Sequence, residues 1–206
     1  MKRTAIALLL ALDACAAPIQ RPEPTSAPSE TLALPLSTDD IEGNFLLRQR
    51  LHYRWREQSG SLDAVVQNTC GELTVVMLTP FGTRAAWARQ RGSNVEGESG
   101  PMPLPFGPER VLLDVQRSHL VPVVAPVDGA SQTTKRIGEQ RLEESWRDGL
   151  LVERVFEDTR GGRLRVRYPT GVRPGEIPSV AELEATPAGY TLDVETVARS
   201  ELECDR

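Results

Sequence analysis

The chain has 206 residues, of which 24 are Lys or Arg, 29 are Asp or Glu and 2 are His, so its formal net charge is −5. This acidic balance argues against a nucleic-acid-binding surface, which needs an excess of basic side chains. The length is sufficient for one domain with a sizeable hydrophobic core.

The N-terminal residues MKRTAIALLLALDACAAP have the features of an export signal. Lys2 and Arg3 precede an apolar stretch, Ala5 to Leu12, that small residues follow. This stretch is too short to remain in a bilayer as a transmembrane helix. We therefore expect the leader to be removed during export.

Two cleavage sites are compatible with this leader. In a lipoprotein signal, Leu12 and Ala14 precede Cys15, whose sulfur receives a diacylglycerol before cleavage. Asp13 departs from that pattern, because its position is usually small or uncharged. The alternative is an ordinary A-x-A site with cleavage after Ala16.

The segment after Cys15 favours the lipoprotein signal. Residues 18–35 contain five prolines among Ser, Thr and Glu, which predicts a disordered, extended tether. A cleaved soluble protein has less need of such a spacer. We therefore expect a signal peptide (1–14), a lipidated cysteine with its tether (15–37) and one folded domain (38–206). The mature chain would carry 22 basic and 28 acidic residues, a net charge of −6.

Alternation of apolar and polar side chains predicts the strands of the domain. It is clearest in LLRQRLHYRW (46–55), RLRVRY (163–168) and YTLDVET (190–196). Less regular candidates are residues 61–67, 73–78, 83–89, 150–157 and 181–185. The pattern therefore predicts seven or eight antiparallel strands.

The apolar faces of these strands should line a core or a cavity. The residues expected there are Leu51, Tyr53, Trp55, Leu73, Val75, Leu164 and Val166. The arginines on the opposite faces are interpreted as a solvated outer surface, and contact with anionic lipid headgroups is the alternative. His52 lies among them and is expected at the surface.

One helix is predicted between the strands, in PFGPERVLLDVQRSHLVP. Pro108 suits a first helical position and Pro122 ends the run. Leu112, Val115 and His119 fall on one side, so an apolar stripe can face the sheet and His119 is expected to be a satisfied core residue. The space between helix and sheet would be filled either by side chains or by an apolar ligand.

Lipidation of Cys15 would leave two other cysteines, Cys70 and Cys204. In an oxidising compartment they could form a disulfide that stabilises the fold by about 4 to 5 kcal/mol. Two free buried thiols are the alternative. Cys70 itself falls in Asn68–Gly71, which is typical of a turn between two strands.

Motifs for catalysis or cofactor binding are absent from the sequence. It contains no Gly-rich phosphate loop, no GxSxG, no HExxH and no cluster with metal-ligand spacing. The acidic pairs Asp39–Asp40 and Glu143–Glu144 are expected at helix ends or surface turns. We therefore expect no catalytic residues, no metal and no cofactor.

Two motifs carry a family resemblance. The runs CGELTVVMLTPFGTR (70–84) and LPFGPERVLLDVQR (104–117) are similar to an uncharacterised family of bacterial lipoproteins in the LolA/LolB superfamily. The resemblance covers Leu46 to Val197. It implies a mainly β (α+β) fold: a curved antiparallel sheet, or incomplete β-barrel, with a helical lid over an apolar cavity. LolB-like proteins have a long helix before the first strand, whereas Ser37 to Asn44 allow only a short one, with Thr38 as a candidate cap.

The resemblance also implies a function. We expect a monomeric outer-membrane lipoprotein, on the inner leaflet facing the periplasm, that binds acyl chains or lipoproteins without catalysis. The alternative is a structural or assembly accessory, for example of a fatty-acid-like or aryl polyene pathway, because members of the similar family are often encoded among the genes of such pathways.

The resemblance also implies a specific role for the turn TPFG (79–82). By order and local pattern, Phe81 matches an exposed leucine that helps LolB-like receptors to insert cargo into the membrane. In the alternative, Pro80 and Gly82 shape an ordinary turn and Phe81 folds back onto the core.

Overall fold

The computed structural model describes residues 36–101, 104 and 106–204. The predicted signal peptide, Cys15 and most of the tether lie outside this range. Residues Leu32–Arg206 form one compact unit. A protein that begins at Leu32 therefore retains every contact described below and is suited to experiments in solution.

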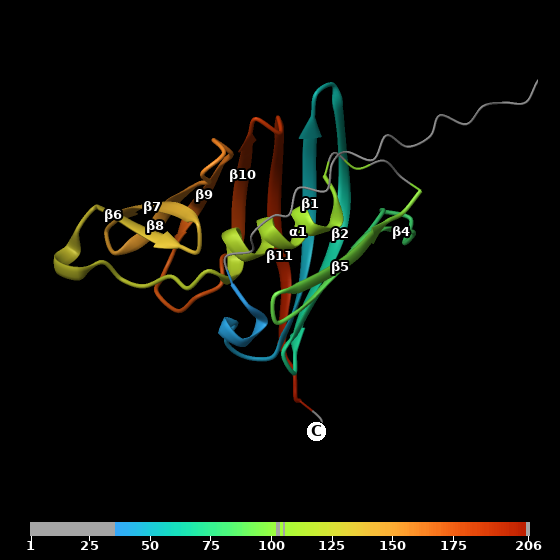
Figure 1. Cartoon of the computed structure of the whole chain (residues 1–206), viewed down its shortest axis with the longest axis horizontal. Coiled ribbons are helices and arrows are strands. Elements are labelled where there is room, and N and C mark those ends of the chain that lie inside the picture. The colour runs from blue at the N-terminus through green and yellow to red at the C-terminus, as the bar shows by residue number, and fades with distance from the viewer. Residues whose placement is uncertain (1–35, 102–103, 105, 205–206) are drawn as a thin grey trace, which may run out of the picture. The chain divides into compact units, whose positions relative to one another are not determined.

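The described residues form a single antiparallel sheet of eleven strands (Figure 1). Its spatial order is β5-β4-β3-β2-β1-β11-β10-β9-β8-β7-β6, so β1 and β11 are paired at its centre. The strands are β1 (Phe45–Trp55), β2 (Gln58–Thr69), β3 (Glu72–Leu78), β4 (Arg84–Arg91), β5 (Asn94–Ser99), β6 (Gln132–Ile137), β7 (Gln140–Arg147), β8 (Leu150–Glu157), β9 (Arg163–Val172), β10 (Val180–Thr186) and β11 (Tyr190–Glu201).

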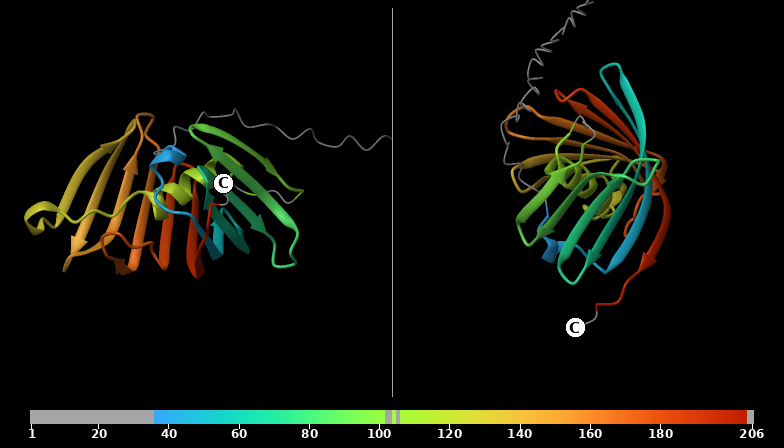
Figure 2. Two further views of the ribbon diagram at one scale, coloured as in Figure 1. Left: turned by 90° about the horizontal axis from the view of Figure 1, so that it is seen from below. Right: turned by 90° about the vertical axis from the view of Figure 1, so that its right-hand side faces the viewer.

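The expected fold class is confirmed: the sheet is curved and unclosed, and a helix lies across its concave face (Figure 2). The expected number of strands was wrong, because β5, β6 and β7 were not predicted. β5 and β6 have mostly polar, exposed side chains, which suits the two edges of the sheet but hides the apolar alternation. In β7 buried and more exposed residues alternate regularly, but two of the buried residues, Gln140 and Glu144, are polar and interrupt the apolar pattern.

The predicted helix begins at Pro108, as expected, and forms α1 (Pro108–Val115). A π-helical turn, η2 (Gln116–Leu120), continues it to the residue before Val121. Gly97 on β5 allows the start of α1 to approach the sheet, because a Cβ atom there would lie 2.6 Å from Cβ of Pro108. Among the described residues no helix is long and apolar enough to span a membrane.

The N-terminal segment forms only a short 3₁₀ helix, η1 (Thr38–Asp40). Its cap is Ser37 rather than Thr38: the Ser37 hydroxyl accepts from the backbone N–H of Asp39, and Asp40 accepts from that of Ser37. Thr38 is instead buried, and its hydroxyl accepts from the backbone N–H of Gly92. Thr38 therefore attaches this segment to the sheet.

A two-residue turn, Cys70–Gly71, joins β2 to β3, and both residues have positive φ angles of 53° and 76°. Such angles are typical of a hairpin turn whose twist matches that of the strands. Cys70 forms a disulfide with Cys204, 134 positions later, with a Cα–Cα distance of 5.6 Å. The disulfide therefore connects the β2–β3 turn to the segment after β11.

The outer face of the sheet carries the arginines, as the alternation predicts. Arg165 on β9 lies 3.5 Å from Glu153 and 3.7 Å from Glu184, on its two neighbouring strands. His52 is exposed and its Nδ1 lies 2.8 Å from Oγ of Ser61. Cross-strand ion pairs of this kind belong to a solvated surface.

Candidate functional site

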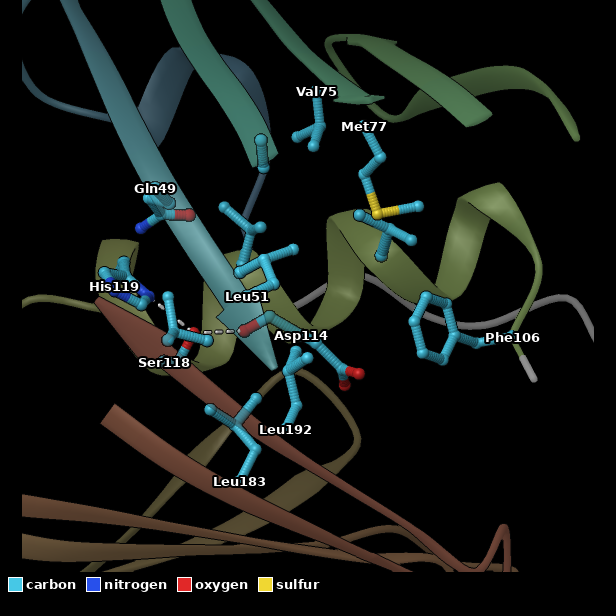
Figure 3. Close-up of a pocket in the computed structure, with 14 residues that line it drawn as sticks. Gln49, Leu51, Val75, Met77, Phe106, Asp114, Ser118, His119, Leu183 and Leu192 are labelled. Atoms are coloured by element: carbon cyan, nitrogen blue, oxygen red, sulfur yellow. Dashed lines mark hydrogen bonds between the residues drawn. The ribbon is translucent and has the colours of Figure 1, made fainter. Parts of the chain in front are cut away.

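A mostly apolar cavity lies between the helical segment and the concave face of the sheet (Figure 3). Its volume is about 30 Å³, which is room for about two water molecules. Its walls are Gln49, Leu51, Ala64, Val75, Met77, Phe106, Val111, Asp114, Val115, Ser118, His119, Leu183, Leu192 and Val194. The side chains therefore fill most of the space between helix and sheet in this conformation.

The seven residues expected on the inner face all belong to or pack against the hydrophobic core, but few line the cavity. Leu51 and Val75 line it. Leu73, Leu164 and Val166 are fully buried but do not line it. Tyr53 and Trp55 are half-buried and pack against the edge of the core. The sequence thus predicted which face is inward, but not where along the strands the cavity lies.

Asp114 is a buried carboxyl group in the cavity wall. The Tyr190 hydroxyl of β11 donates to its Oδ2, and Nε of Arg110 lies 3.2 Å from its Oδ1. Arg110 also donates to the Tyr190 hydroxyl at 2.8 Å. Burial raises the pKa of Asp114, and the Arg110 guanidinium opposes this shift. Burial, followed by the negative charge of Asp114, raises the pKa of Tyr190 well above its usual value. The three groups connect α1 to the middle of the sheet.

Ser118 and His119 form a polar end of the cavity beside Gln49, whereas Met77 and Phe106 lie at the other end (Figure 3). The Ser118 hydroxyl donates to the carbonyl oxygen of Asp114 at 2.5 Å and lies 2.6 Å from Nδ1 of His119. The expectation of a fully satisfied core histidine was wrong in one respect. His119 is buried, but its Nε2 has no hydrogen-bond partner among the described residues.

The end of the helical segment is held by a fully buried arginine, Arg154 on β8. Its two terminal nitrogens donate to the carbonyl oxygens of Val121 and Pro122 at 2.7 and 2.9 Å, and its Nε donates to Glu144 at 2.9 Å. Glu144 was expected at a surface turn or helix end. That expectation was wrong, because Glu144 is buried on β7 to balance this charge.

Asp114, Arg154 and Glu144 were not predicted from the sequence as buried polar groups. Asp114 stands within the apolar run VLLDV, which is a signal that could have marked it. Arg154 gave no such signal, because a β-bulge between Leu151 and Glu153 shifts the alternation of β8. Glu144 gave none because it is a charged residue on a strand that was not predicted. Charged residues on a strand are also exposed far more often than buried.

Phe81 is 94% exposed at the tip of the β3–β4 turn. The backbone N–H of Thr79 donates to the carbonyl oxygen of Thr83, and Gly82 has a φ of +78°. The turn therefore closes without any contribution from the Phe81 side chain. Of the two interpretations of this residue, folding back onto the core does not occur in this structure.

Metal-binding geometry is not found in the described residues: no three His, Cys, Asp or Glu side chains are grouped so that they could hold a metal ion. Of the polar side chains of the cavity, Asp114 accepts from Tyr190, Ser118 donates to the Asp114 carbonyl oxygen and Gln49 donates to Thr196. The arrangement can therefore enclose an apolar molecule and offer it a few polar contacts.

Solved structures that are similar to this chain include two with at most 11% sequence identity. One is a domain described as an outer membrane lipoprotein-sorting protein from Vibrio parahaemolyticus, with 9% identity, a TM-score of 0.46 and coverage of 80% of this chain and 90% of that chain. The other is a DUF1329 family protein from Desulfovibrio piger ATCC 29098, with 11% identity, a TM-score of 0.39 and coverage of 80% and 88%. Structural similarity at this level does not indicate a function for this chain.

A comparison with curated proteins gives no match. A family model, in contrast, matches residues 46–198, which is nearly the stretch that the two motifs indicated. The resemblance to an uncharacterised family is thereby confirmed. The chain belongs to the family described as "Protein of unknown function (DUF3261)".

Proposed function

We propose that this protein is an outer-membrane lipoprotein, anchored through Cys15 on the inner leaflet facing the periplasm, that binds acyl chains or lipoproteins without catalysis. Its role would be the transfer or localisation of envelope lipids or lipoproteins. The observation that carries the proposal is the apolar cavity between α1 and the concave face of the sheet. Ten of its fourteen lining residues have apolar side chains, which suits a hydrocarbon chain.

Uptake of an acyl chain requires the helical segment to move away from the sheet. The cavity volume of about 30 Å³ is far below the roughly 300–1,000 Å³ of ligand pockets. The structure thus corresponds to a closed form in this proposal. The same observation favours the second candidate function, a non-catalytic accessory of envelope assembly whose interior is filled by its own side chains.

Native mass spectrometry separates these two functions. We expect the protein from Leu32 onward, purified from the periplasm, to carry acylated adducts. Ala64→Leu adds three carbons to the cavity wall and should abolish the adducts at a cost of about 1–3 kcal/mol of stability. Val65→Leu on the outer side of the same strand is the matched control and should keep them. A wild-type protein of bare polypeptide mass would instead support the accessory function.

The anchor has its own test. Radiolabelled palmitate should enter the full chain and not the Cys15→Ser variant, because the diacylglycerol is attached to the sulfur of Cys15 before cleavage and the amide-linked chain to its α-amino group afterwards. Two or more chains give stable anchoring, since each buried methylene contributes about 0.8 kcal/mol. Absence of label from both proteins, with a mature terminus at Ala17, would show that the ordinary cleavage site is used.

Phe81 is the proposed point of membrane contact. Phe81→Glu should leave the melting temperature unchanged, because the side chain is exposed, yet reduce flotation of the Leu32–Arg206 protein with phosphatidylethanolamine–phosphatidylglycerol vesicles. Val127→Glu, at another exposed apolar residue near the opposite edge of the sheet, is the control and should float like the wild type. Equal flotation of all three proteins would contradict the proposed contact of Phe81 with the membrane.

A further inference from the structure

A larger cleft adjoins the cavity, and His119 borders both. The cleft has a volume of about 360 Å³ and is formed by residues 41–43, 45, 119–123 and 175–177 together with Arg199. Polar atoms contribute more of its surface than apolar atoms, and Glu42, Glu176 and Arg199 in its lining are exposed. His119 therefore lies where a molecule in the cleft would meet the apolar interior.

Hydrogen bonding determines which nitrogen of His119 carries the proton. The hydroxyl of Ser118 has one proton, and it is donated to the carbonyl oxygen of Asp114, which can only accept. Nδ1 of His119 must therefore be the donor in its contact with the Ser118 oxygen. Burial lowers the pKa of His119 to about 4, so the ring is neutral at neutral pH and Nε2 is unprotonated.

An unprotonated Nε2 is a hydrogen-bond acceptor. It is buried and has no partner among the described residues, although buried acceptors normally have one because leaving them unpaired costs free energy. The partner that this nitrogen lacks is a donor, an O–H or N–H group. An ester carbonyl or a carboxylate would instead place lone pairs against it.

We propose that His119 selects the polar end of the bound molecule, so that the protein prefers acyl or alkyl chains whose head carries a hydroxyl or amide N–H over esters and carboxylates. The chain would extend toward Met77 and Phe106, and the head would lie at the cleft. This inference rests on the proposed binding of acyl chains and adds the chemistry of the head group.

A series of ligands with one chain length tests this preference. The wild-type Leu32–Arg206 protein is loaded with the fluorescent apolar probe 1-aminoanthracene, which decanol, N-methyldecanamide, methyl decanoate or decanoate then displaces. We expect the two donor-bearing compounds to act at concentrations about tenfold lower than the ester and the carboxylate, the effect of one hydrogen bond. His119→Leu should remove this difference, and His52→Leu, at the exposed histidine, should keep it.

Two outcomes would overturn the inference, and they differ from failure of the proposed function. Equal displacement by all four compounds would leave acyl binding intact but exclude selection by His119. Displacement by none would contradict acyl binding itself and this inference with it. If His119→Leu does not fold, the wild-type series still decides. Independently, ¹⁵N NMR of the two histidines should show the proton of His119 on Nδ1, and a proton on Nε2 would overturn the assignment.

Discussion

Loss of the Cys70–Cys204 disulfide is expected to lower the free energy of unfolding by about 5 kcal/mol, because it closes a loop of well over 100 residues in the unfolded chain. The native contacts beside it should remain. The backbone N–H of Cys70 donates to the side chain of Asn44, and that of Leu202 donates to the Asn44 carbonyl oxygen. The effect therefore acts mainly on the unfolded state.

Urea denaturation of the Leu32–Arg206 protein measures this effect. The double variant Cys70→Ser/Cys204→Ser should unfold at a much lower urea concentration than the oxidised wild type. Reduced wild-type protein should match the variant, and the variant itself should not respond to a reducing agent. A difference below about 1 kcal/mol would mean that the denatured chain is already compact where these two residues meet.

Arg154→Ala is expected to lower the free energy of unfolding by about 3–5 kcal/mol, an effect second only to loss of the disulfide. The substitution leaves Glu144 buried and removes the donors to the carbonyl oxygens of Val121 and Pro122. Lys135, 3.1 Å from Glu144, retains part of the charge balance, so the loss should fall toward the lower end of this range. Because those carbonyls end the helical segment, we also expect faster hydrogen exchange of the amides in η2.

The matched control is Arg167→Ala. Arg167 also lies next to a glutamate, at 3.6 Å from Glu153, but its side chain is 52% exposed. Exposed ion pairs contribute about 0–1 kcal/mol, so this variant should unfold almost like the wild type. If the two arginine variants lost equal stability, the burial of Arg154 would not be the cause, and the proposed fixation of the helix end would be incorrect.

The polar contacts of the helical segment bear on how the cavity could open. Asp114 is bound to Tyr190 on β11, the Ser118 carbonyl to Tyr168 on β9, and the segment end to Arg154 on β8. These bonds lie on one half of the sheet. On the other half, Nε2 of Gln116 in η2 donates to Oε1 of Gln90 on β4, and Gly97 on β5 allows the start of α1 to approach closely. Opening on the β4–β5 side would therefore break fewer hydrogen bonds.

Local features of the sequence determined much of this fold. Alternation in LLRQRLHYRW placed Leu51 inward and His52 outward, because successive side chains of a strand point to opposite faces. Pro108 marked the start of α1, because proline suits a first helical turn. The sequence placed Phe81 in a turn, because Pro80 and Gly82 favour the backbone conformation of a turn. It did not show whether the Phe81 side chain is exposed or buried.

The tertiary structure alone decided the site. Whether Leu51 or Leu164 lines the cavity depends on the place where α1 crosses the sheet, and no local pattern contains that information. The burial of Arg154 depends on Glu144 of the neighbouring strand and on the carbonyls of Val121 and Pro122. The proton position on His119 likewise depends on its contact with the Ser118 hydroxyl, which is bonded to the carbonyl oxygen of Asp114. Buried polar groups are stable only with partners, and here register and helix position, rather than sequence neighbours, supply most of them.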